Sequence, residues 1–241
     1  MKEFKNSIVI QSRMGSKRLP GKSNLKIKNK SILEWVISTA KSVSNIDQII
    51  LVTSQERNCD CLVDIAQSEN ISCIRGSEDN VLSRFIKAIE IFKIENCIRI
   101  TGDDLCHDPS LIEIGLQTFI LQESDYLIST TDNFPLLDGL IFEIFKSNLI
   151  LDTFYNRKLD SHDTEHVTKY IRDKKINYKP GFIETKKIPK EYRFRNSIKL
   201  CVDEKIDYLK IKDCWAEKRN NKDIRIADTK KIINNLLNLK N

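Results

Sequence analysis

Short apolar runs alternate with helical patterns over about the first 120 residues, and this alternation restricts the fold more than any other feature. The runs are rich in isoleucine and valine, as in strands buried on both faces. Ser31 and Glu34 have the spacing of a capping box, which begins a helix of 3.6-residue period. Such alternation predicts a mostly parallel, doubly wound α/β sheet. The expected strands are residues 8–10, 49–53, 72–75 and 97–101, and the expected helices begin near residues 31, 61, 81 and 109.

The pattern changes in the second half of the chain, where shorter and more polar segments follow one another. No internal repeat or low-complexity linker divides the chain, so we expect one domain over residues 1–241. The expected elements are strands at residues 126–129 and 140–145, a helix near 166–172, edge strands or a hairpin within 177–188, a strand-like run at 198–202 and a helical tail at 232–239.

The first expected strand ends in a loop rich in basic residues and glycine. A buried strand that ends in this way brings cations and backbone N–H groups to the carboxyl edge of a sheet, where open α/β sheets bind ligands. A polyphosphate suits such a loop because its charge is matched by ammonium, guanidinium and amide groups. The loop contains Arg13, Gly15, Lys17, Arg18, Gly21 and Lys22.

The loop resembles a P-loop but does not match its pattern. Gly15 and Gly21 are separated by five residues instead of four, and Pro20 lacks a backbone donor. Residues 24–30 alternate with a period of two, where a P-loop would begin a helix. We therefore do not expect a P-loop NTPase. A merely solvated basic loop is the other interpretation, and it is less favoured because the cations follow a buried strand directly.

Acidic residues follow two of the strand-like runs. Asp103 and Asp104 come after residues 97–101, and Asp203 comes after residues 198–202. If both runs lie in one sheet, their carboxylates meet beside the basic loop, as in proteins that hold Mg²⁺ against a triphosphate. The alternative is that Asp103 and Asp104 are turn residues.

His162, Glu165 and His166 match the H-x-x-E-H pattern of one class of zinc hydrolases. No third ligand is evident, and a solvated helix start capped by Asp160 or Ser161 explains much of this segment. The zinc-hydrolase interpretation is therefore a minor alternative.

Composition excludes several classes of protein. Of the 241 residues, 40% are hydrophobic and 31% charged, which is ordinary for a globular protein. No apolar run approaches the roughly 20 residues of a membrane span, and we expect neither a signal peptide nor a membrane partner. The net charge of +6 is mild and its lysines are dispersed, so no nucleic-acid partner is expected. Seven cysteines, an odd number, favour reduced thiols in a cytoplasmic protein.

A set of motifs in fixed order carries a resemblance over roughly residues 6–210. The chain resembles the cytidylyltransferase family of spore-coat polysaccharide synthesis proteins, which is related to the acylneuraminate and 3-deoxy-manno-octulosonate cytidylyltransferases. The motifs are residues 11–22 (QSRMGSKRLPGK), 75–77 (RGS), 81–84 (VLSR), 99–103 (RITGD), 108–109 (DP), 138–140 (DGL), 165–168 (EHVT) and 202–203 (VD).

The resemblance implies a GT-A-like nucleotidyltransferase fold with a small β/helical insertion, CTP as donor, Mg²⁺ as cofactor, a sugar-like acceptor and a homodimer. Residues 1–120 would bind the nucleotide, and residues 121–241 would bind the acceptor and form the dimer. Lys22, Arg13 and Asp103 would be catalytic, and Asp103 and Asp203 would bind the metal. The implied nucleotide-binding residues are Gln11, Ser12, Arg13, Gly15, Ser16, Lys17, Arg18, Lys22, Ser77, Arg84 and Thr101, and the implied acceptor-binding residues are Asp104, Asp138, Gly139, Glu143, Glu165 and His166.

The chain departs from the family pattern near the implied acceptor site. Asp104 and Leu105 stand where the family usually has Cys-Pro, Ile141 stands in place of an aspartate, and residues 204–207 (EKID) replace Thr-Pro-Glu-Asp. The acceptor therefore stays open between a sugar acid, which would give a CMP-sugar, and a phosphate, which would give a CDP-linked product. A catalytically silent nucleotide-binding or regulatory protein of the same fold is the remaining alternative.

Overall fold

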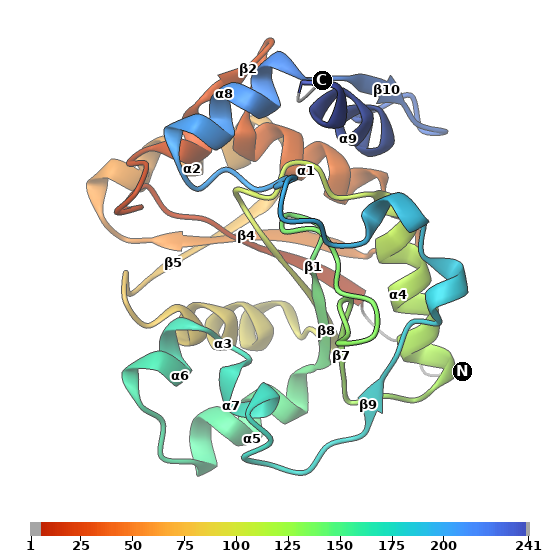
Figure 1. Cartoon of the computed structure of the whole chain (residues 1–241). Coiled ribbons are helices and arrows are strands. Elements are labelled where there is room, and N and C mark those ends of the chain that lie inside the picture. The colour runs from red at the N-terminus through yellow and green to blue at the C-terminus, as the bar shows by residue number, and fades with distance from the viewer. Residues whose placement is uncertain (1–5, 240–241) are drawn as a thin grey trace.

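The structure, a computed structural model, describes residues 6–239 and centres on a seven-stranded sheet (Figure 1). The strand order is β5-β4-β1-β6-β8-β7-β9. Only β8 runs against its neighbours, so the expectation of a mostly parallel sheet is confirmed. The strands are β1 (Asn6–Gln11), β4 (Gln48–Ser54), β5 (Ser72–Gly76), β6 (Asn96–Thr101), β7 (Tyr126–Ile128), β8 (Glu143–Lys146) and β9 (Pro180–Gly181).

Helices cover both faces of the sheet, as a doubly wound fold requires. In β1, Ile8 and Ile10 belong to one hydrophobic core and Val9 belongs to the other, because successive side chains of a strand point to opposite faces. The first core includes residues of α1 (Ile32–Ser42), α2 (Asp60–Ser68), α4 (Pro109–Leu121), α8 (Lys205–Asp213) and α9 (Thr229–Asn238). The second includes residues of α3 (Val81–Phe92), α5 (Ser147–Asn156) and α7 (Lys169–Arg172).

The signals that predicted helix starts are confirmed. Ser31 and Glu34 form the expected capping box at α1, in which the Glu34 N–H donates to Ser31 Oγ at 3.2 Å. Asp108 caps α4, and Pro109 occupies its first turn. Residues 24–30, which alternate with a period of two, form the small hairpin of β2 (Lys26–Ile27) and β3 (Lys30–Ser31).

The prediction of a strand at residues 198–202 is wrong. The apolar side chains Ile198, Leu200 and Val202 of this segment are buried, but the segment has no regular secondary structure and joins no sheet. Its backbone instead bonds to two loops: the Leu200 N–H donates to Asp138 O at 2.8 Å, and the Val202 N–H donates to Asp103 O at 3.3 Å. The alternating apolar pattern correctly predicted that these side chains are buried. It could not predict which backbone groups the segment would hydrogen-bond to.

The turn that receives this segment requires glycine. Gly139 has a φ of +96°, and a Cβ atom there would lie 2.5 Å from the backbone carbon of Leu200. The close approach of the two segments therefore depends on the absence of a side chain at position 139.

Other boundaries in the second half also differ from expectation. The strand expected at 140–145 is confined to β8, and the preceding residues form the turn that contains Gly139. The helix expected near 166–172 is only α7, because Val167 has a φ of +54° and separates it from α6 (Ser161–Glu165). Residues 177–188 contribute the edge strand β9 and no hairpin, while α5 was not predicted.

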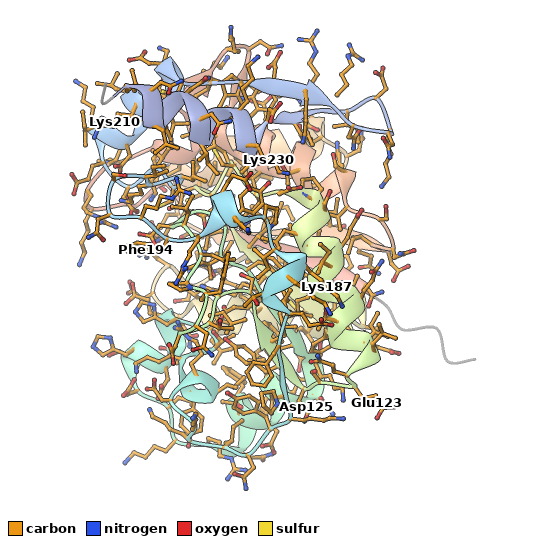
Figure 2. The ribbon with its side chains drawn as sticks, turned by 45° about the vertical axis from the view of Figure 1, so that its right-hand side comes forward. Glu123, Asp125, Lys187, Phe194, Lys210 and Lys230 are labelled. Carbon is orange, nitrogen blue, oxygen red and sulfur yellow. The ribbon has the colours of Figure 1, made fainter. Side chains whose placement is uncertain are left out.

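Figure 2 looks toward the side formed by α4 and the segment that follows β9, on which Lys187 and Phe194 lie. The C-terminal part adds the hairpin β10 (Glu217–Arg219) and β11 (Arg225–Ala227), and α9 confirms the expected helical tail. Within residues 6–239, no helix combines the length and apolar character needed to cross a membrane. All seven cysteines are free thiols.

Candidate active site

A cavity of about 430 Å³ lies at the carboxyl ends of β1 and β6. Most of the predicted nucleotide-binding residues line it, as do Asp103, Glu165 and His166. Gly15 and Ser77 do not: a side chain at Gly15 would meet Glu78, and Ser77 Oγ accepts the Asn80 N–H at 3.0 Å beside the start of α3. The nucleotide-binding residues that line the cavity are Gln11, Ser12, Arg13, Ser16, Lys17, Arg18, Lys22, Arg84 and Thr101.

Lys22 lies between two aspartates at the floor of the site. Its Nζ forms an ion pair with Asp103 Oδ2 and a second one with Asp203 Oδ1 at 3.1 Å. The side chain is nearly buried, which by itself lowers the pKa of Lys22, but the two carboxylates outweigh burial and raise it. Lys22 is therefore a charged ammonium. The sequence predicted the meeting of Asp103 and Asp203, but it placed Lys22 in an exposed loop.

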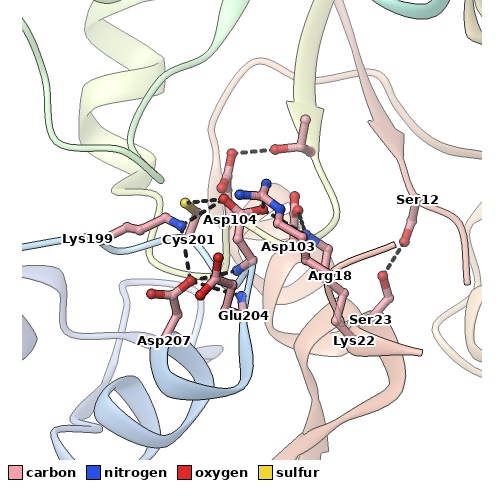
Figure 3. A network of polar contacts seen from close by, with 12 residues as sticks. Ser12, Arg18, Lys22, Ser23, Asp103, Asp104, Lys199, Cys201, Glu204 and Asp207 are labelled. Atoms are coloured by element: carbon pink, nitrogen blue, oxygen red, sulfur yellow. Dashed lines mark hydrogen bonds and ion pairs between the residues drawn. The ribbon is translucent and has the colours of Figure 1, made fainter. Parts of the chain in front are cut away.

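Asp203 is a carboxylate surrounded by cations. Its Oδ1 also pairs with Arg18 at 2.9 Å, and its Oδ2 pairs with Lys199 at 2.8 Å (Figure 3). Burial would raise the pKa of Asp203, but the hydrogen bonds from Lys199 and Lys22 lower it to about 2. Asp203 is therefore ionised at neutral pH.

Asp104 differs from its neighbour Asp103. It is hydrogen-bonded to Thr101 Oγ1 and is not among the residues that line the cavity. Burial, followed by repulsion from Asp103, raises its pKa to about 8. His107 Nε2 lies 4.0 Å from Asp104, and burial lowers the pKa of this imidazole to about 4, so the histidine is neutral.

Arg84 is an unusual arginine. It lies on α3, only 2% of its surface is exposed, and it lines the cavity. Its Nε and one terminal nitrogen have no hydrogen-bond partner among the described residues. Burial lowers its pKa, while Glu78 opposes this. Because buried donors are almost always satisfied, such a guanidinium is suited to binding an anion.

Arg13 joins the basic loop to the opposite wall of the cavity. It donates to Glu78 O at 3.2 Å and pairs with Glu78 Oε1 at 3.4 Å. Its other terminal nitrogen lies 3.6 Å from Glu165 Oε1 on α6. Arg13 therefore connects the loop after β1 with α6 through side chains alone.

The predicted acceptor-binding residues divide into two groups. Glu165 and His166 line the cavity, whereas Asp138, Gly139 and Glu143 do not. Asp138 and Gly139 form the turn that receives residues 198–202. Of this set, therefore, only Glu165 and His166 line the cavity together with the predicted nucleotide residues.

Glu143 is the first residue of the interior strand β8 and is 2% exposed. It pairs with Arg99 and accepts hydrogen bonds from Tyr126 and from Thr168, the latter at 2.6 Å. Burial would raise its pKa, but Arg99 and these hydrogen bonds lower it. Arg99 Nε also donates to Gln11 Oε1 at 3.0 Å, so Glu143 supports the cavity through Arg99.

The H-x-x-E-H pattern does not form a zinc site in the described part of the chain. The rings of His162 and His166 are stacked with centroids 6.2 Å apart and both are exposed. No group of three or more His, Cys, Asp or Glu side chains within residues 6–239 is arranged to hold a metal ion. Asp160 caps α6, since its Oδ1 accepts the Asp163 N–H at 2.8 Å, as the helix-start interpretation predicted.

The sequence did not reveal two residues that hydrogen-bond to Asp203. Lys199 and Asp207 bond to it and to each other, and they stand four residues before and after it. The regular spacing of these opposite charges was the signal that could have revealed the contacts. Whether residues at this spacing meet depends, however, on the conformation of residues 198–204.

A mostly parallel α/β sheet whose first strand leads into a basic loop is the fold of the nucleotidyltransferases. Comparison of sequences identifies the family, because the family profile described as "Cytidylyltransferase" matches residues 7–232. The chain belongs to the cytidylyltransferase family.

Two curated relatives and one solved structure illustrate the match. The chain is 31% identical over 230 residues to the spore coat polysaccharide biosynthesis protein SpsF of Bacillus subtilis, covering 94% of this chain and 92% of that protein. It is 27% identical over 199 residues to the 3-deoxy-manno-octulosonate cytidylyltransferase of Chlamydia trachomatis, covering 80% and 66%. A cytidylyltransferase from Leptospira borgpetersenii superimposes with a TM-score of 0.78 at 25% identity, covering 88% and 86%.

Proposed function

We propose that the protein transfers a cytidylyl group from CTP to a sugar-like acceptor. An acceptor oxygen attacks the α-phosphorus, the bond from that phosphorus to the bridging oxygen breaks, and pyrophosphate leaves. The observation that carries this proposal is the position of Lys22 between Asp103 and Asp203 in a cavity that Arg84 and Arg18 also line. Cations are available for a triphosphate, and two carboxylates are available for its metal ion.

Asp103 and Asp203 fit a Mg²⁺ ion. Their carboxylates already converge on one cation, the Lys22 ammonium, and hard oxygen ligands suit Mg²⁺. When bound, the ion would neutralise charge that develops on the phosphate oxygens during transfer. Lys22 would then pair with the phosphates, while Arg84 would donate its unpartnered N–H groups to an anionic oxygen.

The acceptor would bind on the side of Glu165 and His166. These side chains come from the second half of the chain and line the cavity opposite the basic loop. A sugar acid is supported by the name of the Chlamydia relative, and a role in polysaccharide synthesis by that of the Bacillus relative. A sugar or polyol phosphate is the second acceptor class, because the chain departs from the family pattern at Asp104 and Ile141.

CTP with Mg²⁺ should raise the thermal midpoint of the protein more than ATP or GTP does. A ligand at a hundredfold excess over its Kd stabilises the folded state by about 2.7 kcal/mol. A thermal shift assay with the four nucleotides measures this directly. Equal shifts for all of them, or none, would reject CTP as the donor.

Pyrophosphate release distinguishes the enzyme from a silent nucleotide-binding protein of the same fold. A panel of sugar acids and sugar phosphates, tested with CTP, should contain an acceptor that triggers release. CTP binding without release across the panel would favour the silent protein.

We also propose a cytoplasmic homodimer of one-domain subunits, in which residues 1–120 bind the nucleotide and residues 121–241 bind the acceptor and form the interface. The exposed aromatic residues Tyr155, Phe182 and Phe194 belong to this second half. Phe182 directly follows the edge strand β9 and exchanges two hydrogen bonds with Gln122, next to Leu121, which is 81% exposed. An apolar patch beside a sheet edge is suited to a two-fold contact.

Light scattering should therefore report twice the 28.0 kDa mass of one chain at micromolar concentration. Phe182→Asp should shift the mass toward that of a monomer, because a charge would have to be buried in the contact. Lys186→Asp, on a side chain that is 80% exposed, is the matched control. A monomeric wild-type protein across the micromolar range would reject the dimer.

A further inference from the structure

The two carboxylate oxygens of Asp203 face different partners. Oδ1 meets Lys22 at 3.1 Å and Arg18 at 2.9 Å, both of which line the cavity. Oδ2 meets Lys199 at 2.8 Å. One oxygen is therefore held by residues that line the cavity, while the other is held by a residue that does not.

Asp207 fixes both the main chain and the side-chain partner of Asp203. Its Oδ2 accepts the Asp203 N–H at 3.1 Å and the Glu204 N–H at 2.9 Å. The same oxygen accepts a hydrogen bond from Lys199 Nζ at 3.0 Å. Asp203, Lys199 and Asp207 thus form a closed triangle of contacts at the start of α8.

Asp203 needs such support more than Asp103 does. Asp103 follows β6, an interior strand of the sheet, within two residues of its last residue, Thr101. Asp203 follows an irregular segment that lies outside every sheet. The backbone alone therefore leaves more freedom for the carboxylate of Asp203 than for that of Asp103.

We propose that Lys199 and Asp207 are positioning residues that turn Asp203 Oδ1 toward Asp103, so that the two aspartates can share one metal ion. This inference rests on the proposed function, in which these aspartates hold the metal of a nucleotide complex. Groups that orient metal ligands without touching the metal alter metal affinity by about 10–100-fold when they are replaced.

A purely structural role is the competing explanation. Asp207 is the third residue of a capping box with Glu204 and could serve only to begin α8. Replacements would then lower the thermal midpoint and leave metal binding unchanged. Metal affinity is therefore the quantity that separates the two roles.

The experiment measures Mn²⁺ binding by electron paramagnetic resonance, with the full-length protein saturated by a CTP analogue whose α,β-bridge is methylene. Lys199→Met is the decisive variant. By charge alone, removing a cation beside Asp203 would tighten the binding of Mn²⁺. We expect the opposite, an affinity about tenfold weaker, because the carboxylate loses its orientation.

Three further variants complete the design. Lys199→Arg should restore most of the affinity, because a guanidinium can pair with both aspartates. Asp207→Asn keeps an oxygen for the two N–H groups, so α8 stays capped, but it loses the charge that holds Lys199 and should also weaken Mn²⁺ binding. Lys210→Met changes an exposed lysine of the same helix and should leave the affinity unchanged.

The outcomes separate this inference from the proposed function. If the wild-type complex binds Mn²⁺ and Lys199→Met binds it equally well or more tightly, the positioning role is overturned and the metal site stands. If the wild-type complex binds no Mn²⁺, both the metal assignment and the positioning role fail.

Discussion

Replacing Asp103 with asparagine is expected to reduce metal-dependent turnover by several orders of magnitude. The amide is neutral and leaves Asp203 as the only carboxylate paired with Lys22, so the metal ion of the nucleotide complex loses one of its two proposed protein ligands. Pyrophosphate release at saturating CTP and Mg²⁺ measures the loss. Asp203→Asn should give a loss of similar size.

The fold should survive this replacement. Asp103 is paired with Lys22, so Asp103→Asn removes an ion pair instead of relieving a repulsion, and a modest decrease in the thermal midpoint is expected. Lys22 keeps its contact with Asp203. Asp104→Asn is the matched control, because Asp104 is hydrogen-bonded to Thr101 and is not paired with Lys22, so it should have less influence on the metal. Activity that survives in Asp103→Asn but disappears with a zinc chelator would instead revive the hypothesis based on His162 and His166.

Replacing Lys22 with methionine is expected to weaken CTP binding by about tenfold or more. Charge-assisted hydrogen bonds contribute about 1.5–3 kcal/mol, and 1.4 kcal/mol corresponds to a factor of ten. Methionine retains much of the apolar stem, which is nearly buried, so the change removes mainly the ammonium. Isothermal titration calorimetry of CTP with Mg²⁺ measures the effect, and an unchanged Kd would show that Lys22 does not contact the nucleotide.

Lys22→Met should also differ from the wild type in its response to Mg²⁺ in the absence of nucleotide. Without the ammonium, Asp103 and Asp203 repel each other, so the nucleotide-free protein should lose stability at neutral pH. Mg²⁺ should restore more of the thermal midpoint in Lys22→Met than in the wild type, because it replaces the missing positive charge. Lys26→Met, at an exposed lysine of β2, is the control for both measurements.

The sequence predicted the first half of the fold well because its signals are local. Strands β1 and β4 contain continuous apolar runs, and the capping box at Ser31 and the Asp108-Pro109 pair mark helix starts within a few residues. The second half was harder because its short elements depend on contacts between distant segments. Residues 198–202 are buried like a strand, but their backbone partners are the carbonyls of Asp138 and Asp103.

The sequence predicted many residues of the candidate site, but it did not predict how they are arranged in space. The resemblance to the family selected Arg84 and Asp203, and the structure places Asp203 beside Asp103 even though the strand expected to carry it does not form. No local pattern reveals that Lys22 is nearly buried or that Glu143 lies away from the cavity, because both facts depend on how the loops after β1 and β6 pack.

In the proposed function, Arg13 would couple nucleotide binding to the position of α6. In the structure this one side chain spans from Glu78 to Glu165 of α6. A phosphate oxygen that binds Arg13 must compete with Glu165 for the same guanidinium. Thermodynamic linkage then requires that whatever strengthens the hold of α6 on Arg13 weakens the nucleotide, and the reverse. Binding of the proposed donor would thus loosen the contact between Arg13 and Glu165 on the proposed acceptor side.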